Sequence, residues 1–201
     1  MKKPYLVAFV CVLAVVGLAG CTTEQSSTNQ SGGAKMDDTS TSASKLSSPG
    51  KLPDDQIQNK KAVISTPKGT IEITLWADKA PLTVSNFVYL ANQGFYDGLT
   101  FHRVEEGFVV QGGDPDGNGT GDPGYKFDDE KVQGEYVEGT VAMANSGPNT
   151  NGSQFFINLE DNSSKLTKAY NLFGQVTSGM DVVKQLVKGD KMTSVKVVSA
   201  Q

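Results

Sequence analysis

The order of hydrophobic and polar positions predicts a mostly β domain in the C-terminal part of the chain. From Thr70 to Leu75 the two kinds of residue alternate with a period of two, which is typical of a strand with one buried face. A Pro-Lys-Gly turn at residues 67–69 precedes this run, so residues 61–76 are expected to form a hairpin. Further strand-like runs follow at short intervals, at residues 99–104, 108–112, 139–144, 154–158, 173–176 and 193–199.

Two other segments have the hydrophobic spacing of a helix. The first begins at Pro81, a residue favoured in the first helical turn, and is expected to stop at Gly94. The second covers residues 180–188 and is expected to stop at Gly189. About eight strands and two helices within residues 58–201 predict a closed eight-stranded antiparallel β-barrel that is capped by two α-helices.

The first twenty residues have the pattern of an export signal. Lys2 and Lys3 precede an apolar run over residues 6–18, which is short for a transmembrane helix because such a helix needs about 20 apolar residues. The Leu-Ala-Gly-Cys sequence that ends at Cys21 resembles the lipobox of bacterial lipoproteins. This resemblance implies cleavage after residue 20 and a lipid anchor on Cys21 at the extracytoplasmic face of the cell membrane. An ordinary secretory signal that contains a cysteine is the alternative.

Residues 21–57 are expected to be a flexible tether between the lipidated cysteine and the domain. Nineteen of the 29 residues from 22 to 50 are Ser, Thr, Gly, Asn or Gln, and none is aromatic. Such a segment buries too little apolar surface to offset the entropy of the chain. The folded domain itself is therefore predicted to span residues 58–201.

Charge and composition exclude several classes of protein. Loss of Lys2 and Lys3 with the signal changes the net charge from −4 to −6, and no basic patch stands out, so nucleic-acid binding is not expected. The only cysteines, Cys11 and Cys21, precede the domain, which therefore has no disulfide. One histidine, His102, excludes histidine-rich metal sites. We expect a monomer without a metal or another cofactor.

Arg103 is the only arginine in the chain. A guanidinium offers a planar fork of donors and keeps its charge. From the sequence alone, a single arginine at position 103 is equally compatible with a functional site and with a surface ion pair. The neighbouring His102 would lie on the opposite face of a strand and is expected to be structural. Without a paired acid and a serine motif, a hydrolase triad is improbable.

Three long motifs resemble the cyclophilin family of peptidyl-prolyl isomerases. They are Phe-His-Arg-Val at residues 101–104, Gly-Phe-Val-Val-Gln-Gly-Gly-Asp at 107–114, and Met-Ala-Asn-Ser-Gly-Pro-Asn-Thr-Asn-Gly-Ser-Gln-Phe-Phe-Ile at 143–157. The resemblance extends over about residues 62–198. It implies the fold of that family and cis–trans isomerisation of prolyl bonds in proline-containing polypeptides.

The resemblance also implies the residues of the site. Arg103 would stabilise the twisted prolyl amide, apolar side chains would hold the proline ring, and polar groups would bind the substrate backbone. The implied substrate-binding residues are Phe108, Val109, Gln111, Ala144, Asn145, Ser146, Gln154, Phe156, Leu166 and Tyr170. The chain departs from the common family pattern at Glu105 and Glu106, which stand where an apolar residue and a proline are usual.

Three functions compete at this point. The first is an isomerase that assists the folding of exported proteins at the outer face of the membrane. The second is a chaperone or adhesive module that binds proline segments and has only incidental turnover. Such a binder needs the apolar pocket but does not need Arg103. The presence of Arg103 in the sequence therefore favours the enzyme. The third is a solute-receptor lipoprotein, for which a domain of 144 residues is small.

Overall fold

A computed structural model describes residues 46–200. The predicted signal at residues 1–20 and the predicted lipidation site Cys21 lie outside the described residues, as does most of the predicted tether. Among the described residues, no helix is both long and apolar enough to cross a membrane.

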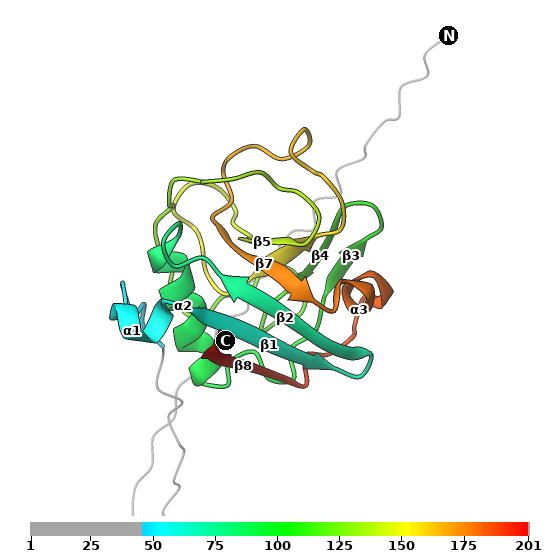
Figure 1. Ribbon diagram of the computed structural model, residues 1–201, viewed down its shortest axis with the longest axis horizontal. Coiled ribbons are helices and arrows are strands. Elements are labelled where there is room, and N and C mark those ends of the chain that lie inside the picture. Colours follow the sequence, from blue (N-terminus) through cyan, green and yellow to red (C-terminus); the bar gives the residue numbers. More distant parts are fainter. Residues whose placement is uncertain (1–45, 201) are drawn as a thin grey trace, which may run out of the picture. The chain divides into compact units, whose positions relative to one another are not determined.

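Eight antiparallel strands form one sheet within residues 46–200 (Figure 1). Their order across the sheet is β3-β4-β6-β5-β7-β2-β1-β8. The predicted hairpin is present, since β1 and β2 pair from Lys61–Thr74 to Thr66–Gly69. The strands are β1 (Lys60–Thr66), β2 (Gly69–Leu75), β3 (Arg103–Glu105), β4 (Val109–Gly112), β5 (Thr140–Met143), β6 (Phe155–Asn158), β7 (Leu172–Ser178) and β8 (Ser194–Ser199).

The sheet is an open half-barrel, so the prediction of a closed barrel is wrong. β3 and β8 are the two edges of the sheet and do not pair with each other. The segments that precede them meet instead, through an isolated bridge between Thr100 and Lys191 and a 2.8 Å bond from Phe101 N to Asp190 O. Gly98 and Gly189 have positive φ angles of 82° and 97° near this contact. These turns interrupt the extended backbone that a continuous ladder would need.

Three helices accompany the sheet within the described residues: α1 (Asp54–Ile57), α2 (Pro81–Asn92) and α3 (Met180–Gln185). α2 has the predicted start, and its first turn is capped from a distant loop. The carboxylate of Glu130 accepts bonds of 2.8 Å from Leu82 N and from Thr83 N. α3 is shorter than predicted because Leu186 adopts an extended conformation and is buried, with 3% of its surface exposed.

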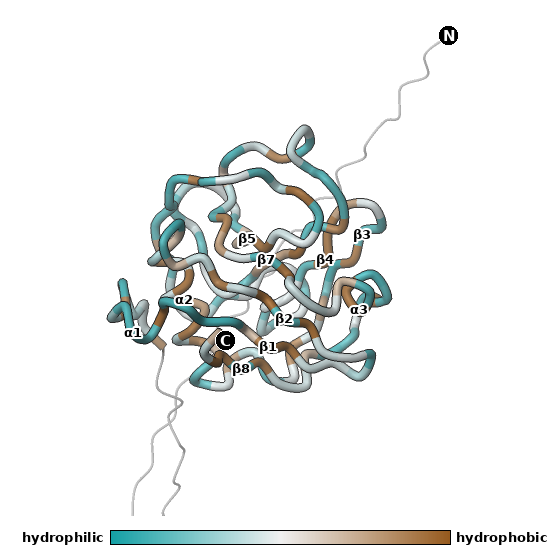
Figure 2. The backbone as a smooth tube through the Cα atoms, viewed as in Figure 1, coloured by the Kyte–Doolittle hydropathy of each residue, from teal (hydrophilic) through white to brown (hydrophobic). Residues whose placement is uncertain are grey.

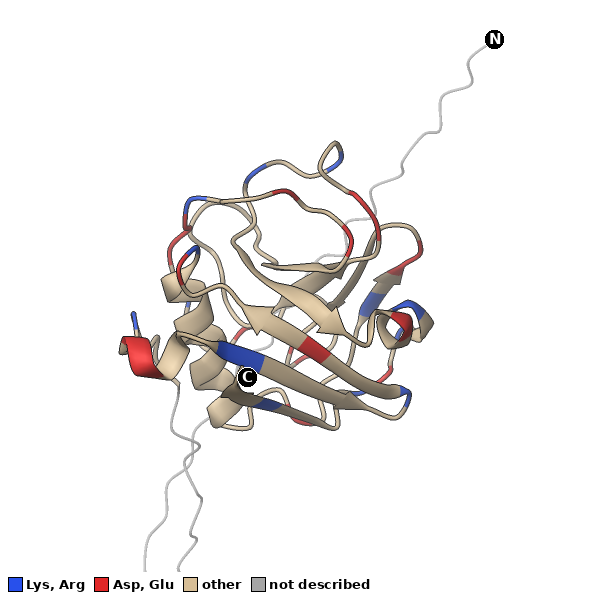
Figure 3. Ribbon diagram, in the orientation of Figure 1, with Lys and Arg blue, Asp and Glu red and all other residues tan. Residues whose placement is uncertain are grey.

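The main core lies between α2 and the inner face of the sheet. Its aromatic centre is a set of four rings whose closest pairs have centroids 5.1–5.8 Å apart, namely Phe87, Tyr96, Phe155 and Phe173. Hydrophobic residues follow the strands and α2, whereas α1 and the peripheral loops are largely hydrophilic (Figure 2). Basic and acidic residues are interspersed along the ribbon, and neither kind is confined to one element (Figure 3).

The packed domain begins before residue 58, where the sequence placed its start. Ile57 is fully buried in the main core, and Leu46 and Leu52 pack against that core. Leu52 N also donates a 2.9 Å bond to the hydroxyl of Ser85 on α2. The last twelve residues of the predicted tether are therefore part of the folded unit, because three apolar side chains within them find partners on the domain.

Candidate active site

A second, smaller hydrophobic cluster lies on the outer face of the sheet and forms the base of the candidate site. Strand alternation creates it, because residues that are neighbours in sequence point to opposite faces. Val110 and Ile157 face the main core, whereas Val109 and Phe156 belong to the outer cluster. The outer face of the sheet therefore carries a cluster of buried apolar side chains of its own.

Strand register places three of the predicted site residues, Arg103, Gln111 and Phe156, in one row on that outer face. Arg103 on β3 pairs with Gln111 on β4, Gln111 pairs with Phe156 on β6, and Phe156 pairs with Ala142 on β5. Residues directly opposite each other in antiparallel strands have their side chains close together. The arginine and the glutamine therefore stand beside the apolar surface through register alone.

A cavity of about 240 Å³ opens on this row, and it is called the apolar cavity because six of its nine lining residues are aromatic or aliphatic. All nine residues that line it were predicted for the site from the sequence. They are Arg103, Phe108, Val109, Gln111, Ala144, Asn145, Phe156, Leu166 and Tyr170.

Arg103 is held at the rim of the apolar cavity by contacts on two sides. Its Nη1 donates a 3.1 Å bond to Oε1 of Gln111. Its Nε and Nη2 lie 2.9 Å and 2.8 Å from Oε1 of Glu105. The guanidinium carbon also lies 5.6 Å from the centre of the Phe108 ring. The side chain keeps 44% of its surface exposed, so a ligand in the cavity can reach it.

Gln111 connects Arg103 to a neighbouring loop. Its amide nitrogen donates a 2.9 Å bond to Oε1 of Gln154, and Nε2 of Gln154 donates a 2.9 Å bond to the carbonyl of Gly121. These bonds orient the Gln111 oxygen toward Arg103, since an amide that donates through its nitrogen accepts through its oxygen. Gln111 is therefore hydrogen-bonded to Arg103 through its oxygen and to Gln154 through its nitrogen.

A polar cavity of about 230 Å³ adjoins the apolar cavity and shares Gln111, Ala144 and Asn145 with it. The remaining two predicted residues, Ser146 and Gln154, line this second cavity. The rest of its lining is Gly119, Thr120, Gly121, Asp122, Lys126, Thr150, Gly152 and Ser153.

The segment after β5 forms the boundary between the two cavities. Ala144 N donates a 2.9 Å bond to Gln154 O, which continues the pairing of β5 beyond its end. The side-chain amide of Asn145 donates a 2.7 Å bond to Ala169 O, and Ser146 N donates a 2.8 Å bond to the hydroxyl of Thr150. These bonds fix the path of the backbone between the two cavities.

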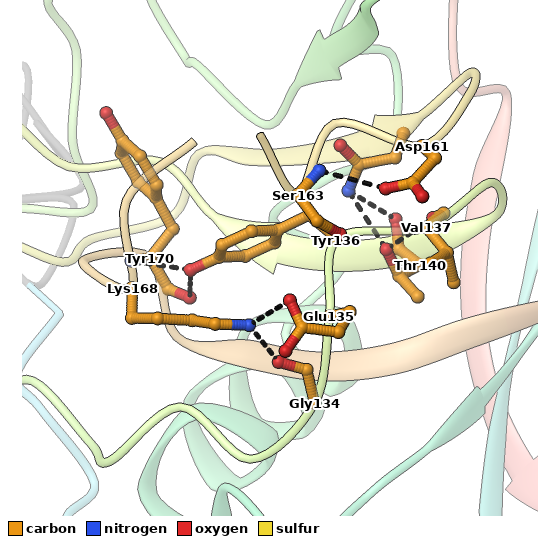
Figure 4. Close-up of polar contacts among 10 residues, drawn as sticks. Gly134, Glu135, Tyr136, Val137, Thr140, Asp161, Ser163, Lys168 and Tyr170 are labelled. Carbon is orange, nitrogen blue, oxygen red and sulfur yellow. Dashed lines mark hydrogen bonds and ion pairs between the residues drawn. The ribbon is translucent and has the colours of Figure 1, made fainter. Parts of the chain in front are cut away.

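Tyr170 forms the far wall of the apolar cavity and is held by a buried tyrosine. The hydroxyl of Tyr136 donates a 2.8 Å bond to Tyr170 O and accepts a 3.1 Å bond from Tyr170 N (Figure 4). The Tyr170 ring packs edge-on against Phe156, with centroids 5.5 Å apart. Burial raises the pKa of Tyr136, so its hydroxyl stays protonated and can donate. Lys168 closes the same loop by pairing with Glu135 at 2.6 Å.

His102 precedes β3 and lies outside the lining of both cavities. Only 7% of its surface is exposed, and neither ring nitrogen has a hydrogen-bond partner. Burial lowers its pKa, although the nearby carboxylate of Asp114 acts in the opposite direction.

Sequence reasoning missed the loop that completes the polar cavity. Asp114 is 1% exposed, and its carboxylate accepts 2.9 Å bonds from the backbone N–H groups of Asp116 and Asn118 and a further bond from Gly119 N. Burial would raise the pKa of Asp114, but these backbone donors outweigh it and hold the pKa below its usual value. The place of this glycine-rich loop beside Gln154 depends on tertiary contacts, which the local sequence does not reveal. No cluster of metal-ligating side chains occurs among residues 46–200.

An open β half-barrel with an apolar cavity, a guanidinium at its rim and an adjoining polar cavity places the chain in the class of β proteins with a surface binding site. Comparison with known proteins identifies the class more closely. Residues 61–201 match the family model described as cyclophilin type peptidyl-prolyl cis-trans isomerase/CLD. The chain belongs to this family, and it is a peptidyl-prolyl cis-trans isomerase.

Individual relatives agree with this assignment. The chain is 47% identical over 141 residues to a peptidyl-prolyl cis-trans isomerase of Synechococcus elongatus, an alignment that covers 69% of this chain and 97% of the relative. It is 49% identical over 129 residues to peptidyl-prolyl cis-trans isomerase B of Bacillus subtilis, covering 63% and 90% respectively. The crystal structure of a Cryptosporidium parvum cyclophilin superposes with a TM-score of 0.65 at 30% identity, covering 70% of this chain and 98% of that one.

Proposed function

We propose that this isomerase acts on proline-containing segments of exported polypeptides at the outer face of the membrane, where a lipid on Cys21 anchors it. The activity itself follows from family membership. The apolar cavity supports proline as the bound side chain, because proline offers a compact aliphatic ring. A Cryptosporidium parvum cyclophilin of similar fold, with a TM-score of 0.60, was crystallised in the presence of the dipeptide Ala-Pro. The export signal and the lipobox support the location.

The proposed mechanism needs no covalent step. Rotation about a prolyl bond is slow because amide resonance sets a barrier of about 18–20 kcal/mol. Twisting the bond localises a lone pair on the proline nitrogen. A guanidinium N–H near that nitrogen stabilises the twisted state more than either planar state, and an interaction that is stronger in the transition state accelerates the reaction.

The observation that carries this mechanism is the position of Arg103. It lines the same cavity as Phe108 and Phe156, so a proline ring between these aromatic side chains would present its amide to the guanidinium. A hydrogen bond to a charged group contributes about 1.5–3 kcal/mol. This corresponds to roughly 10- to 150-fold in rate. The remaining acceleration would come from holding the substrate backbone along residues 144–146.

Exchange NMR on a peptide with one X-Pro bond tests the role of Arg103. We expect Arg103→Ala to lower kcat by about 10- to 100-fold, because the charged donor is lost. Arg103→Lys should restore only part of kcat, since an ammonium lacks the planar fork. Both variants should still bind the peptide. Unchanged turnover in Arg103→Ala would contradict the mechanism and favour a proline-binding module.

The proposed location has a separate test. Cells supplied with labelled palmitate should incorporate the label into the wild-type chain but not into Cys21→Ser. The wild-type chain should sediment with membranes and resist extraction by salt, because more than one acyl chain gives stable anchoring. A chain that carries no label and is secreted freely would show that residues 1–20 are an ordinary secretory signal.

A further inference from the structure

Glu105 makes the closest contacts of any residue with the guanidinium of Arg103 among the described residues. Its Oε1 atom lies 2.9 Å from Nε and 2.8 Å from Nη2. The resemblance to the family implies an apolar residue at this position, so the proposed mechanism assigns no role to a carboxylate there. From these contacts we propose that Glu105 is a positioning residue, which holds Arg103 in the orientation needed at the apolar cavity. The inference rests on the proposed role of Arg103.

The strand geometry makes this contact a built-in feature of β3. Glu105 and Arg103 are two residues apart on one strand, so their side chains point to the same face. The register agrees, because Glu105 pairs with Val109 and Arg103 pairs with Gln111, two residues that line the cavity. Glu105 therefore lies beside the guanidinium on the cavity face of the sheet.

The two partners of Arg103 hold different nitrogens of the guanidinium. Glu105 accepts from Nε and Nη2 of the guanidinium, whereas Gln111 accepts one hydrogen bond of 3.1 Å from Nη1. A guanidinium has five N–H donors. Three of them are engaged, which leaves one on each terminal nitrogen for a ligand. The arrangement fixes the plane of the group without consuming the donors that the mechanism requires.

Without Glu105, the guanidinium would keep a support on one side only. Gln111 is itself oriented by Gln154, but β3 is a three-residue edge strand, and Arg103 is 44% exposed. A long exposed side chain loses rotamer freedom when it is ordered, so an unsupported arginine would sample several orientations. Small errors in the placement of a catalytic group lower the rate of the chemical step.

The chain offers a matched control at the adjacent position. Glu106 is exposed, lies outside the lining of both cavities, and has the same charge as Glu105. Glu105→Gln and Glu106→Gln therefore change the net charge equally, but only the first changes a partner of Arg103. A general electrostatic effect on the site would appear in both variants.

The spectroscopic test uses the fact that Arg103 is the only arginine in the chain. In the ¹⁵N-labelled mature protein, the arginine Nε–H region of the NMR spectrum should contain one signal, which belongs to Arg103. We expect Glu105→Gln to move this signal toward the position of free arginine and to speed its exchange with water. Glu106→Gln should leave the signal where it is.

Kinetics on an uncharged peptide with one Ala-Pro bond complete the test. Glu105→Gln should lower kcat by about two- to fivefold, the effect expected for a half-exposed ion pair, with KM changed by less than about twofold. Glu106→Gln should behave as the wild type. The inference is overturned if the Nε–H signal stays in place, if kcat is unchanged, if the change is in KM alone, or if both variants lose activity equally. Unchanged activity in Arg103→Ala would instead contradict the proposed mechanism, whatever the NMR signal of Glu105→Gln shows.

Discussion

At the scale of single residues, the site depends on side chains that position others. Gln111 and Glu105 orient Arg103, and Tyr136 holds the backbone of Tyr170 through two hydrogen bonds. None of these supports needs unusual chemistry. Their common effect is to reduce the number of conformations that the cavity wall can adopt before a substrate arrives.

Tyr136→Phe tests this view of the far wall. Loss of the hydroxyl should lower the free energy of unfolding by about 1–3 kcal/mol, because Tyr170 N and O lose a buried partner. We also expect KM for a prolyl peptide to rise about two- to fivefold, since a mobile Tyr170 defines the cavity less well. Chemical denaturation and exchange NMR measure the two effects.

Tyr125→Phe is the matched control, because the Tyr125 hydroxyl also donates one hydrogen bond, at 2.7 Å to Asn86, outside the lining of the apolar cavity. It should lower stability without raising KM. An equal rise in KM in both variants would show that the effect comes from general loosening of the fold.

At the scale of elements, the segment that leads into β1 belongs to the domain. α1 ends at Ile57, whose side chain is fully buried, and Leu52 is hydrogen-bonded to α2. This segment lies outside the part of the chain that matches the family model. The segment from residue 46 to residue 57, which composition assigned to the tether, is therefore packed against the half-barrel domain.

Ile57→Ala measures how much this attachment contributes. Removing a large buried aliphatic side chain should lower the free energy of unfolding by about 2–5 kcal/mol. kcat/KM should not change in the folded protein, because Ile57 lies outside the lining of both cavities. Val198→Ala, at a position that is 41% exposed, should cost less than about 1 kcal/mol. Similar small losses in both variants would mean that the segment does not stabilise the domain.

At the scale of the whole molecule, one buried histidine links stability to pH. Burial lowers the pKa of His102, an effect that the carboxylate of Asp114 opposes and that the charges of Arg103 and Lys188 reinforce. The unfolded chain therefore binds a proton at a higher pH than the folded chain does. Stability from this residue is complete above the unfolded pKa of about 6.5 and is lost as the pH falls from that value through the lower pKa of the folded state.

The free energy of unfolding should accordingly decrease on acidification between about pH 8 and pH 5, as measured by urea denaturation. Because His102 is the only histidine, His102→Gln should remove most of this slope, even if the variant is less stable at every pH. A slope that persists in the variant would assign the titration to another group.

Much of the fold was accessible from local pattern. The hairpin of β1 and β2, the start of α2 and the eight antiparallel strands follow from alternation, turn residues and Pro81, which act over short stretches of sequence. The resemblance to the family also indicated every residue that lines the apolar cavity, including Leu166 and Tyr170, which lie outside the three motifs. Three of these residues, Arg103, Gln111 and Phe156, lie on neighbouring strands, and the strand register brings them together.

What only the tertiary structure decided concerns contacts between segments that are distant in sequence. The sheet stays open because the chain before β3 meets the chain before β8 in turns, and α3 ends early because Leu186 is buried in an extended conformation. The burial of Ile57 in the core is also a long-range contact. A single apolar residue in a polar segment does not reveal whether a partner surface exists. The Glu105 contact with Arg103 likewise depends on where two long side chains meet, which hydrophobic periodicity does not specify. The sequence by itself therefore determined the family, the strands and the residues of the cavity, whereas long-range packing decided the edges of the sheet and the support of the guanidinium.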